Sequence, residues 1–210
     1  MVEEVEATYA ETRAETGLAA MSPAVRAALG KVERHRLVPQ EQVGAAYRNH
    51  PLPIGAGQTI SQPYIVALST DLLEPAPGQV VLDVGTGSGY QAALLAEIVG
   101  QVYSIETIDS LARAAERRLS ALGYRNIEIC AGDGYKGWPE KAPFDGIVVT
   151  AAAPGVPHAL VEQLKPGGRM VIPLGAEHAV QHLTLITRRA KGGYDERRVL
   201  PVRFVPLVPG

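Results

Sequence analysis

The stretch that decides the fold is V-V-L-D-V-G-T-G-S-G-Y, residues 80–90. A short, mostly apolar run ends at Val84, and glycines then occupy positions 85, 87 and 89. Helical spacing of apolar residues begins at Tyr90. Glycines between a strand and a helix let the backbone turn sharply and approach a ligand closely. The stretch therefore predicts a buried strand, a ligand-binding loop and a helix of an α/β sheet.

The same alternation continues on both sides of this stretch. Apolar runs predict strands at 80–84, 102–105, 127–130, 144–149 and 170–174, and helical spacing predicts helices at 64–73, 90–98, 111–122 and 157–165. Strands that are apolar almost throughout and alternate with helices predict a doubly wound, mostly parallel sheet with helices on both faces. Two further runs, 183–187 and 199–205, flank Gly192-Gly193 and predict an antiparallel C-terminal hairpin.

The first third of the chain has a different character. Residues 1–50 have helical spacing, which is clearest after the helix-start signal Ser22-Pro23. Residues 51–63 are punctuated by glycine and proline and fit neither a strand nor a helix, so we expect a loop there, either ordered or disordered. We therefore predict a single domain over 1–210, with a helical N-terminal extension at 1–50, a loop at 51–63 and a cofactor-binding α/β core at 79–210.

Composition excludes several classes of function. The formal net charge of −2 gives no electrostatic reason to expect nucleic acid as a partner. No apolar run is long enough to span a membrane, and the acidic N-terminus is unlike a secretory signal, so we expect a cytoplasmic protein. His178 and His182 are four residues apart but have no third ligand at suitable spacing. No metal site is predicted.

The glycine loop favours one kind of cofactor. The dinucleotide fingerprint requires glycine where this chain has Tyr90, so the spacing is G-x-G-x-G and not G-x-G-x-x-G. Asp83 precedes the loop, and a carboxylate there would repel a pyrophosphate but bind a cationic amino group. The segment resembles the cofactor loop of class I methyltransferases, which bind S-adenosylmethionine. The resemblance implies a Rossmann-like fold in which Asp83, Gly85, Gly87 and Gly89 lie at the cofactor.

Two more loops follow strands of the expected sheet. Glu106 closes the second strand, where a carboxylate can accept hydrogen bonds from both hydroxyls of a ribose. Asp133 and Gly134 follow the third strand, and Asp133 can accept from the exocyclic amine of adenine. Because the carboxyl ends of adjacent parallel strands meet in one crevice, these loops together predict a site for S-adenosylmethionine and its product S-adenosylhomocysteine.

The segment P-L-P-I-G-A-G-Q-T-I-S-Q-P, residues 51–63, resembles the signature of protein-L-isoaspartate O-methyltransferases. The resemblance continues through G-D-G, A-P-F-D, V-T-A-A, L-K-P-G-G and R-F-V-P-L, from about residue 20 onward. It implies that residues 51–63 are the active-site loop and that Ser61 is the active-site hydroxyl. The implied cofactor contacts in this loop are Gln58, Thr59 and Ile60, and the implied substrate contacts are Ile54, Ser61 and Val208. The chain departs from many relatives before this string, where it has Asn49-His50 in place of an aspartate.

The resemblance implies methyl transfer from S-adenosylmethionine to the free α-carboxylate of L-isoaspartyl residues in damaged proteins and peptides. The ester would start repair through a succinimide. The resemblance implies no stable protein partner for the enzyme. Two alternatives stay open: an aspartyl O-methyltransferase of a ribosomally made peptide, and a non-catalytic S-adenosylmethionine-binding adaptor. Ser61 itself has two possible roles, orientation of the acceptor or capping of the helix that starts at Pro63, and they are compatible with each other.

Overall fold

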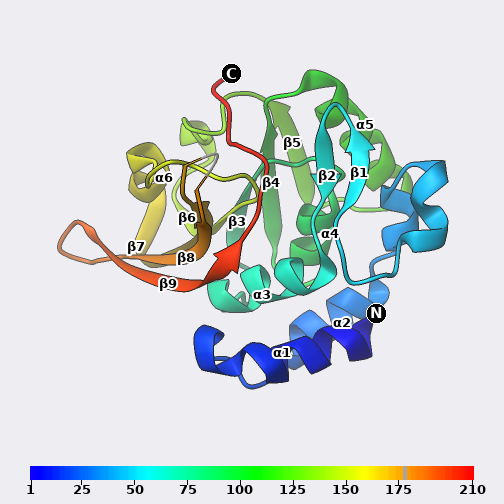
Figure 1. The fold of residues 1–210 in the computed structure, drawn as a ribbon. Coiled ribbons are helices and arrows are strands. Elements are labelled where there is room, and N and C mark those ends of the chain that lie inside the picture. Colours follow the sequence, from blue (N-terminus) through cyan, green and yellow to red (C-terminus); the bar gives the residue numbers. More distant parts are fainter. Residues whose placement is uncertain (177–178) are drawn as a thin grey trace.

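The computed structural model describes residues 1–176 and 179–210, and it contains a seven-stranded sheet in the order β5-β4-β3-β6-β7-β8-β9 (Figure 1). The strands are β3 (Val80–Val84), β4 (Gln101–Glu106), β5 (Ile127–Ala131), β6 (Phe144–Val149), β7 (Leu164–Leu174), β8 (Gln181–Arg188) and β9 (Tyr194–Val202). The first five in sheet order run parallel, and β8 and β9 add an antiparallel edge. The predicted α/β class and the terminal hairpin are confirmed.

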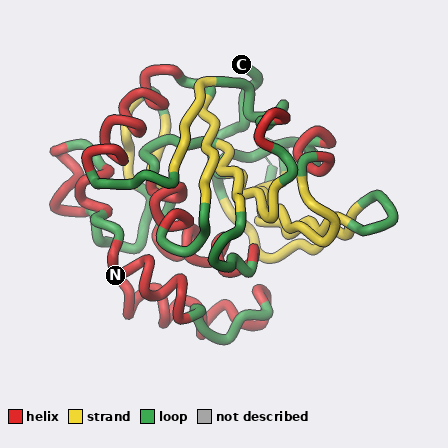
Figure 2. The backbone as a smooth tube through the Cα atoms, turned by 180° about the vertical axis from the view of Figure 1, so that it is seen from behind, coloured by secondary structure: helices red, strands yellow, loops and turns green. Residues whose placement is uncertain are grey.

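Helices cover both faces of the sheet, as the view from behind also shows (Figure 2). They are α1 (Val2–Thr16), α2 (Pro23–Lys31), α3 (Pro63–Leu73), α4 (Tyr90–Ala96), α5 (Asp109–Ala121) and α6 (His158–Glu162). Successive residues of β3 point to opposite faces, so Val81 belongs to the apolar cluster that includes residues of α1 to α5, while Leu82 belongs to the cluster that includes residues of α6. Among the described residues, no helix is long and apolar enough to cross a membrane.

Residues 51–63 differ from the prediction, because they form an antiparallel hairpin and not a loop without strands. Its strands are β1 (Leu52–Gly55) and β2 (Gln58–Ile60), joined by a turn in which residues 55, 56 and 57 all have positive φ. Leu52 and Ile54 are buried while Pro53 is exposed, which is the alternation of a strand. The prolines beside them hide this two-residue period in the sequence.

Other boundaries also differ. The last strand was predicted at 199–205, but β9 starts five residues earlier and ends three residues earlier. Its start was missed because residues 194–198 are polar and mostly exposed. Helix α6 is shorter than predicted, and β7 begins at Leu164, before the Gly167-Gly168 pair. Much of the segment between α2 and β1 is 3-10 helix, η1 (Arg34–Leu37) and η2 (Gln40–Ala45), and a third short 3-10 helix is η3 (Pro139–Lys141). The division at 1–50, 51–63 and 79–210 stays a prediction.

A buried polar contact docks the N-terminal helix onto α3. The Tyr9 hydroxyl donates to Asp71 Oδ2 at 2.6 Å, and the Ser22 backbone N–H donates to the same oxygen at 3.2 Å. Burial and the neighbouring Asp71 carboxylate raise the pKa of Tyr9. The Tyr9 ring also meets the Tyr64 ring edge to face, with centroids 5.5 Å apart. Helix α1 is thus fixed against α3, the helix that follows the β1–β2 hairpin, at both Tyr64 near its start and Asp71 near its end.

We predict that Tyr9→Phe lowers the free energy of unfolding by about 1.5–3 kcal/mol, because the ring is kept but a hydrogen bond to a buried carboxylate is lost. Denaturant titration measures the change. Tyr47→Phe is the matched control, since its hydroxyl contacts His35 at an exposed site. Equal unfolding free energies for both variants would contradict the role given to the Tyr9–Asp71 contact.

Candidate active site

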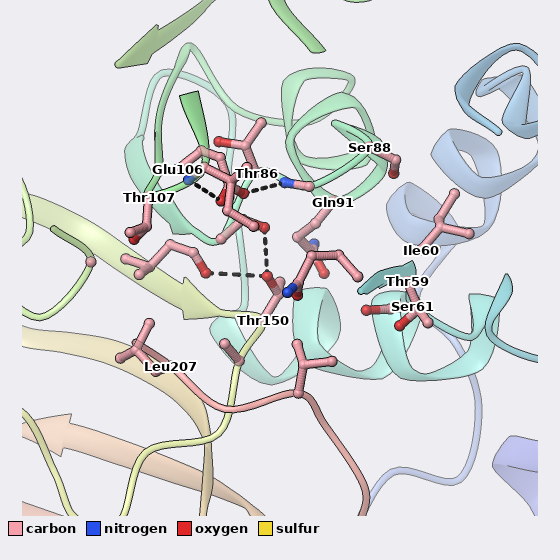
Figure 3. A pocket seen from close by; sticks show the side chains of 18 of the residues that line it. Thr59, Ile60, Ser61, Thr86, Ser88, Gln91, Glu106, Thr107, Thr150 and Leu207 are labelled. Carbon is pink, nitrogen blue, oxygen red and sulfur yellow. Dashed lines mark hydrogen bonds between the residues drawn. The ribbon is translucent and has the colours of Figure 1, made fainter. Parts of the chain in front are cut away.

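A cavity lies at the carboxyl ends of β3, β4 and β6, between the β1–β2 hairpin and the C-terminal tail (Figure 3). Its empty space, open mouth included, is about 740 Å³. The lining comes from Gln58, Thr59, Ile60, Ser61, Val66, residues 84–88, Tyr90, Gln91, residues 105–108, Gly134, Thr150, Ala151 and residues 205–208. The loops after β3 and β4 meet here as expected, and the loop after β5 contributes Gly134, while the end of β6 was not among the expected strand ends.

The glycine loop is held by a close contact with β6. Thr150 Oγ1 donates to the Gly85 carbonyl at 2.6 Å. A Cβ built at position 85 would lie only 2.5 Å from Thr150 Oγ1. Gly85 also has a φ of +97°, which disfavours any side chain. Gly85 and Gly87 line the cavity as predicted. Gly89 does not, because it packs against Leu119 of α5 behind the loop.

Glu106 points into the cavity from the end of β4 (Figure 3). Its two carboxylate oxygens accept the backbone N–H groups of Gly87, at 2.8 Å, and Ile108, at 2.9 Å. A carboxylate has about four lone-pair sites, so each oxygen keeps room for one more donor. Glu106 thus holds the loop and still fits the two hydroxyls of a ribose.

Asp83 lies beneath the loop and not in the cavity lining. Its side chain is fully buried and accepts from Ser104 Oγ at 2.8 Å, and the hydroxyls of Ser104 and Thr86 are 2.6 Å apart. Burial raises the pKa of Asp83 from 3.8 to about 7. Asp83 is thus placed outside the cavity lining, and its contact with a cofactor ammonium group stays a prediction. Asp83 supports Thr86 through Ser104, and Thr86 lines the cavity.

Asp133 also lies outside the cavity lining, and its contact with adenine stays a prediction. The Asp133 carboxylate accepts the Tyr135 N–H at 2.9 Å and pairs with Lys136 at 3.4 Å. The C-terminal Gly210 covers it, since a Cβ built there would lie 3.1 Å from Asp133 Cα. Gly134 does line the cavity, as predicted.

Ser61 lies where the cavity meets a second groove. Both are lined by Thr59, Ser61, Thr150 and Val205, and the groove continues along Thr8, Tyr64 and residues 200–204. Ser61 is half-buried, and its hydroxyl has no hydrogen-bond partner among the described residues. The structure does not support its role as helix cap. The residue before α3 is Gln62, and the Tyr64 N–H donates a hydrogen bond to Asn49 Oδ1 at 2.9 Å.

The predicted substrate contacts Ile54 and Val208 are placed differently from each other. Ile54 is buried and packs toward Gly87, outside the lining of either cavity. Val208 is 45% exposed and lines the cavity. The tail that carries it is fixed by two backbone hydrogen bonds to Ala152, whose N–H donates to the Val205 carbonyl and whose carbonyl accepts from the Leu207 N–H. Tyr135 Oη adds a third bond to this tail, at the Leu207 carbonyl.

Several lining residues were not predicted. Thr107 and Thr150 stand directly after β4 and β6, where the rule that ligands bind at strand ends could have found them. Gln58, Thr59 and Ile60, which were predicted, do line the cavity. Among the described residues, no group of three or more His, Cys, Asp or Glu could hold a metal ion. His178 lies outside the described residues, so a metal-free site stays a prediction.

Comparison with known proteins gives consistent matches. The family model "Protein-L-isoaspartate(D-aspartate) O-methyltransferase" matches residues 9–210. The chain is 56% identical over 207 residues to a protein named protein-L-isoaspartate O-methyltransferase 2 of Polaromonas sp., covering 99% of this chain and 98% of that protein. It is 55% identical over 208 residues to protein-L-isoaspartate O-methyltransferase 1 of Cupriavidus necator, covering 99% and 80%.

Solved structures agree. One named protein-L-isoaspartate O-methyltransferase superposes with a TM-score of 0.82 at 28% identity, covering 98% of this chain and 65% of that longer chain. A putative protein-L-isoaspartate O-methyltransferase from Plasmodium falciparum, in complex with S-adenosyl-L-homocysteine, superposes with a TM-score of 0.77 at 26% identity. That match covers 98% of this chain and 97% of the other.

The raised pKa of Asp83 predicts a pH-dependent stability. Between pH of about 4 and 7 the folded protein holds this proton more tightly than the unfolded chain, so stability falls as the pH rises through this window and is constant above it. The slope is at most about 1.4 kcal/mol per pH unit. Asp83→Asn cannot titrate, so we expect the wild-type unfolding free energy, relative to this variant, to decrease from pH 4 to 7. A difference independent of pH would contradict the raised pKa.

Proposed function

Since this chain belongs to the protein-L-isoaspartate(D-aspartate) O-methyltransferase family, we propose that Ser61 orients the substrate carboxylate where the cofactor cavity meets the second groove. The chain is an enzyme with S-adenosylmethionine as its cofactor and L-isoaspartyl residues of proteins as its substrates. We propose that the acceptor is the free α-carboxylate, and that the ester starts repair through a succinimide. The position of Ser61, with a free hydroxyl between two cavities, is the observation that supports its role.

The residues of the cavity fit this cofactor. Glu106 has acceptor sites left for ribose hydroxyls, and Gly85 and Gly87 line the cavity without side chains. Residues 58–60 would hold it on the hairpin side and Val208 on the tail side. Asp83 would act on it through Thr86, and Asp133 through the backbone of Gly134. When bound, S-adenosylmethionine supplies an electrophilic methyl group on a sulfonium.

The chain itself has to position the acceptor and exclude water. A main-chain carboxylate with a pKa of about 3.5 is ionised at neutral pH, so the enzyme needs no general base. Ser61 can donate one hydrogen bond to it without removing its charge. Positioning of this kind contributes up to about 7–11 kcal/mol in well-oriented reactions. The tail, held to Ala152 and Tyr135, closes the cavity from the side opposite the hairpin and limits access of water.

The alternative functions gain no support from the comparisons. None of the relatives described above is named as a peptide-maturation enzyme or as an adaptor. We propose that isoaspartyl proteins and peptides are transient partners, without a stable protein, nucleic-acid or membrane partner. A cytoplasmic location is also part of the proposal, and it is supported by the dependence on S-adenosylmethionine, which cells make in the cytoplasm.

We predict strong selectivity for the isoaspartyl linkage. A site built to bind the freed carboxylate leaves its donors unpaired when a normal aspartyl peptide enters, which can discriminate by about 10⁴–10⁵. The test is methyl transfer from labelled S-adenosylmethionine to a synthetic isoaspartyl peptide and to its aspartyl twin, compared as kcat/KM. Equal rates for both peptides would refute the repair function while leaving the methyltransferase activity intact.

We predict that Ser61→Ala lowers single-turnover methylation while thermal stability and S-adenosylhomocysteine affinity stay close to wild type, because Ser61 caps no helix. Ser61→Thr keeps the hydroxyl but adds a methyl group beside the reacting atoms, so it should also be slow. Ser110→Ala, at an exposed position of α5, is the matched control. Wild-type turnover in Ser61→Ala would show that the hydroxyl does not orient the acceptor.

A further inference from the structure

The first turn of α3 begins two residues after Ser61, and its cap comes from elsewhere in the chain. Pro63 occupies the first helical position and has no N–H, so the first free donor is the Tyr64 N–H. In most helices the residue just before the helix satisfies such a donor with its own side chain. Here the Gln62 side chain makes no such bond, and the Tyr64 N–H donates a hydrogen bond to Asn49 Oδ1 at 2.9 Å.

Asn49 makes two more contacts, so its position is well determined. Its backbone carbonyl accepts from Gln62 Nε2 at 3.0 Å, and its Nδ2 donates to Thr8 Oγ1 of α1 at 3.4 Å. Asn49 is half-buried between α1 and α3. The residue therefore joins three segments: the N-terminal helix, the chain entering the β1–β2 hairpin, and the start of α3.

This arrangement determines what Ser61 is free to do. A serine hydroxyl can accept a local hydrogen bond from the backbone N–H three residues further on, which for Ser61 is that of Tyr64 in the first turn of α3. Such a bond would turn its hydroxyl toward the helix and occupy a lone pair. Because Asn49 takes the Tyr64 N–H, the Ser61 hydroxyl stays without a protein partner among the described residues, at the junction of the cavity and the groove.

We propose that Asn49 is a positioning residue for methyl transfer, because it caps α3 in place of Ser61 and thereby leaves the Ser61 hydroxyl free for the acceptor carboxylate. This inference rests on the proposed role of Ser61. The task suits an asparagine, since its side chain accepts with one atom and donates with the other and so binds α3 and α1 at once. An aspartate keeps the acceptor for α3 but has no N–H group to donate to Thr8.

The test is a double-mutant cycle with Asn49→Ala, Ser61→Ala and the double variant. Four quantities are measured: kcat and KM for an isoaspartyl peptide, the affinity for that peptide in the presence of S-adenosylhomocysteine, the affinity for S-adenosylhomocysteine itself, and hydrogen exchange at the Tyr64 amide. Asn49→Leu repeats the measurements at similar side-chain volume in case the alanine variant fails to fold. Asn126→Ala is the matched control, since Asn126 is also a half-buried asparagine that joins segments by side-chain hydrogen bonds, in its case from Nδ2 to the carbonyls of Ala96 and Val99, outside the groove.

We expect Asn49→Ala to lower kcat by about tenfold or more, since Ser61 turns toward the unsatisfied Tyr64 N–H. Peptide affinity should fall, the Tyr64 amide should exchange faster, and S-adenosylhomocysteine affinity should stay within about twofold of wild type. In the Ser61→Ala background the same change should have little further effect on kcat. Asn49→Asp keeps the cap and should restore most of the turnover. Asn126→Ala should lose stability and keep its turnover.

Two results would overturn the inference alone. In the first, Asn49→Ala turns over at the wild-type rate although its Tyr64 amide has lost protection. In the second, the effects of Asn49→Ala and Ser61→Ala on kcat multiply, so that the residues act independently. Wild-type turnover in Ser61→Ala would instead refute the proposed role of Ser61, and the inference with it.

Discussion

The close approach of β3 and β6 is the constraint on which the site depends. Thr150 Oγ1, at the end of β6, donates to the Gly85 carbonyl at 2.6 Å, which is possible only because position 85 has no Cβ. The contact fixes the path of the glycine loop where it leaves the sheet. From there Gly87 can donate to Glu106, and the ends of β3, β4 and β6 enclose one cavity. Any side chain at Gly85 would push the loop away from Thr150 and open this arrangement.

Buried polar groups hold the same loop from below. Glu106 accepts from two backbone N–H groups, and the hydroxyls of Thr86 and Ser104 connect the loop to Asp83 Oδ2. An unpaired buried carboxylate is costly, so these contacts limit the conformations that the loop can adopt without ligand. The loop is therefore largely pre-organised, and less binding free energy has to be used to order it.

The sequence predicted most of the fold and part of the site. The periodicity around 80–90 and the strand-end rule were sufficient for the parallel sheet, the cavity, and the placement of Glu106. They were not sufficient for Asp83 and Asp133. Both are acidic residues beside glycines at strand ends, but side-chain direction depends on contacts far away in sequence. Ser104 draws Asp83 under the loop, and the C-terminal tail covers Asp133. Neither contact has a local sequence signal.

The same reasoning explains why the role of Ser61 could not be decided from its neighbours. Ser-Gln-Pro before a helix is a good capping sequence, and local spacing alone favours a capping role about as much as a free hydroxyl. The cap is supplied by Asn49, a residue outside the motif, because the chain before β1 folds back against the start of α3. A reaction that needs orientation and no general base benefits from a hydroxyl with no competing protein partner. The packing of the N-terminal segment thus affects the acceptor site through one residue, because the Asn49 side chain binds both α1 and the start of α3.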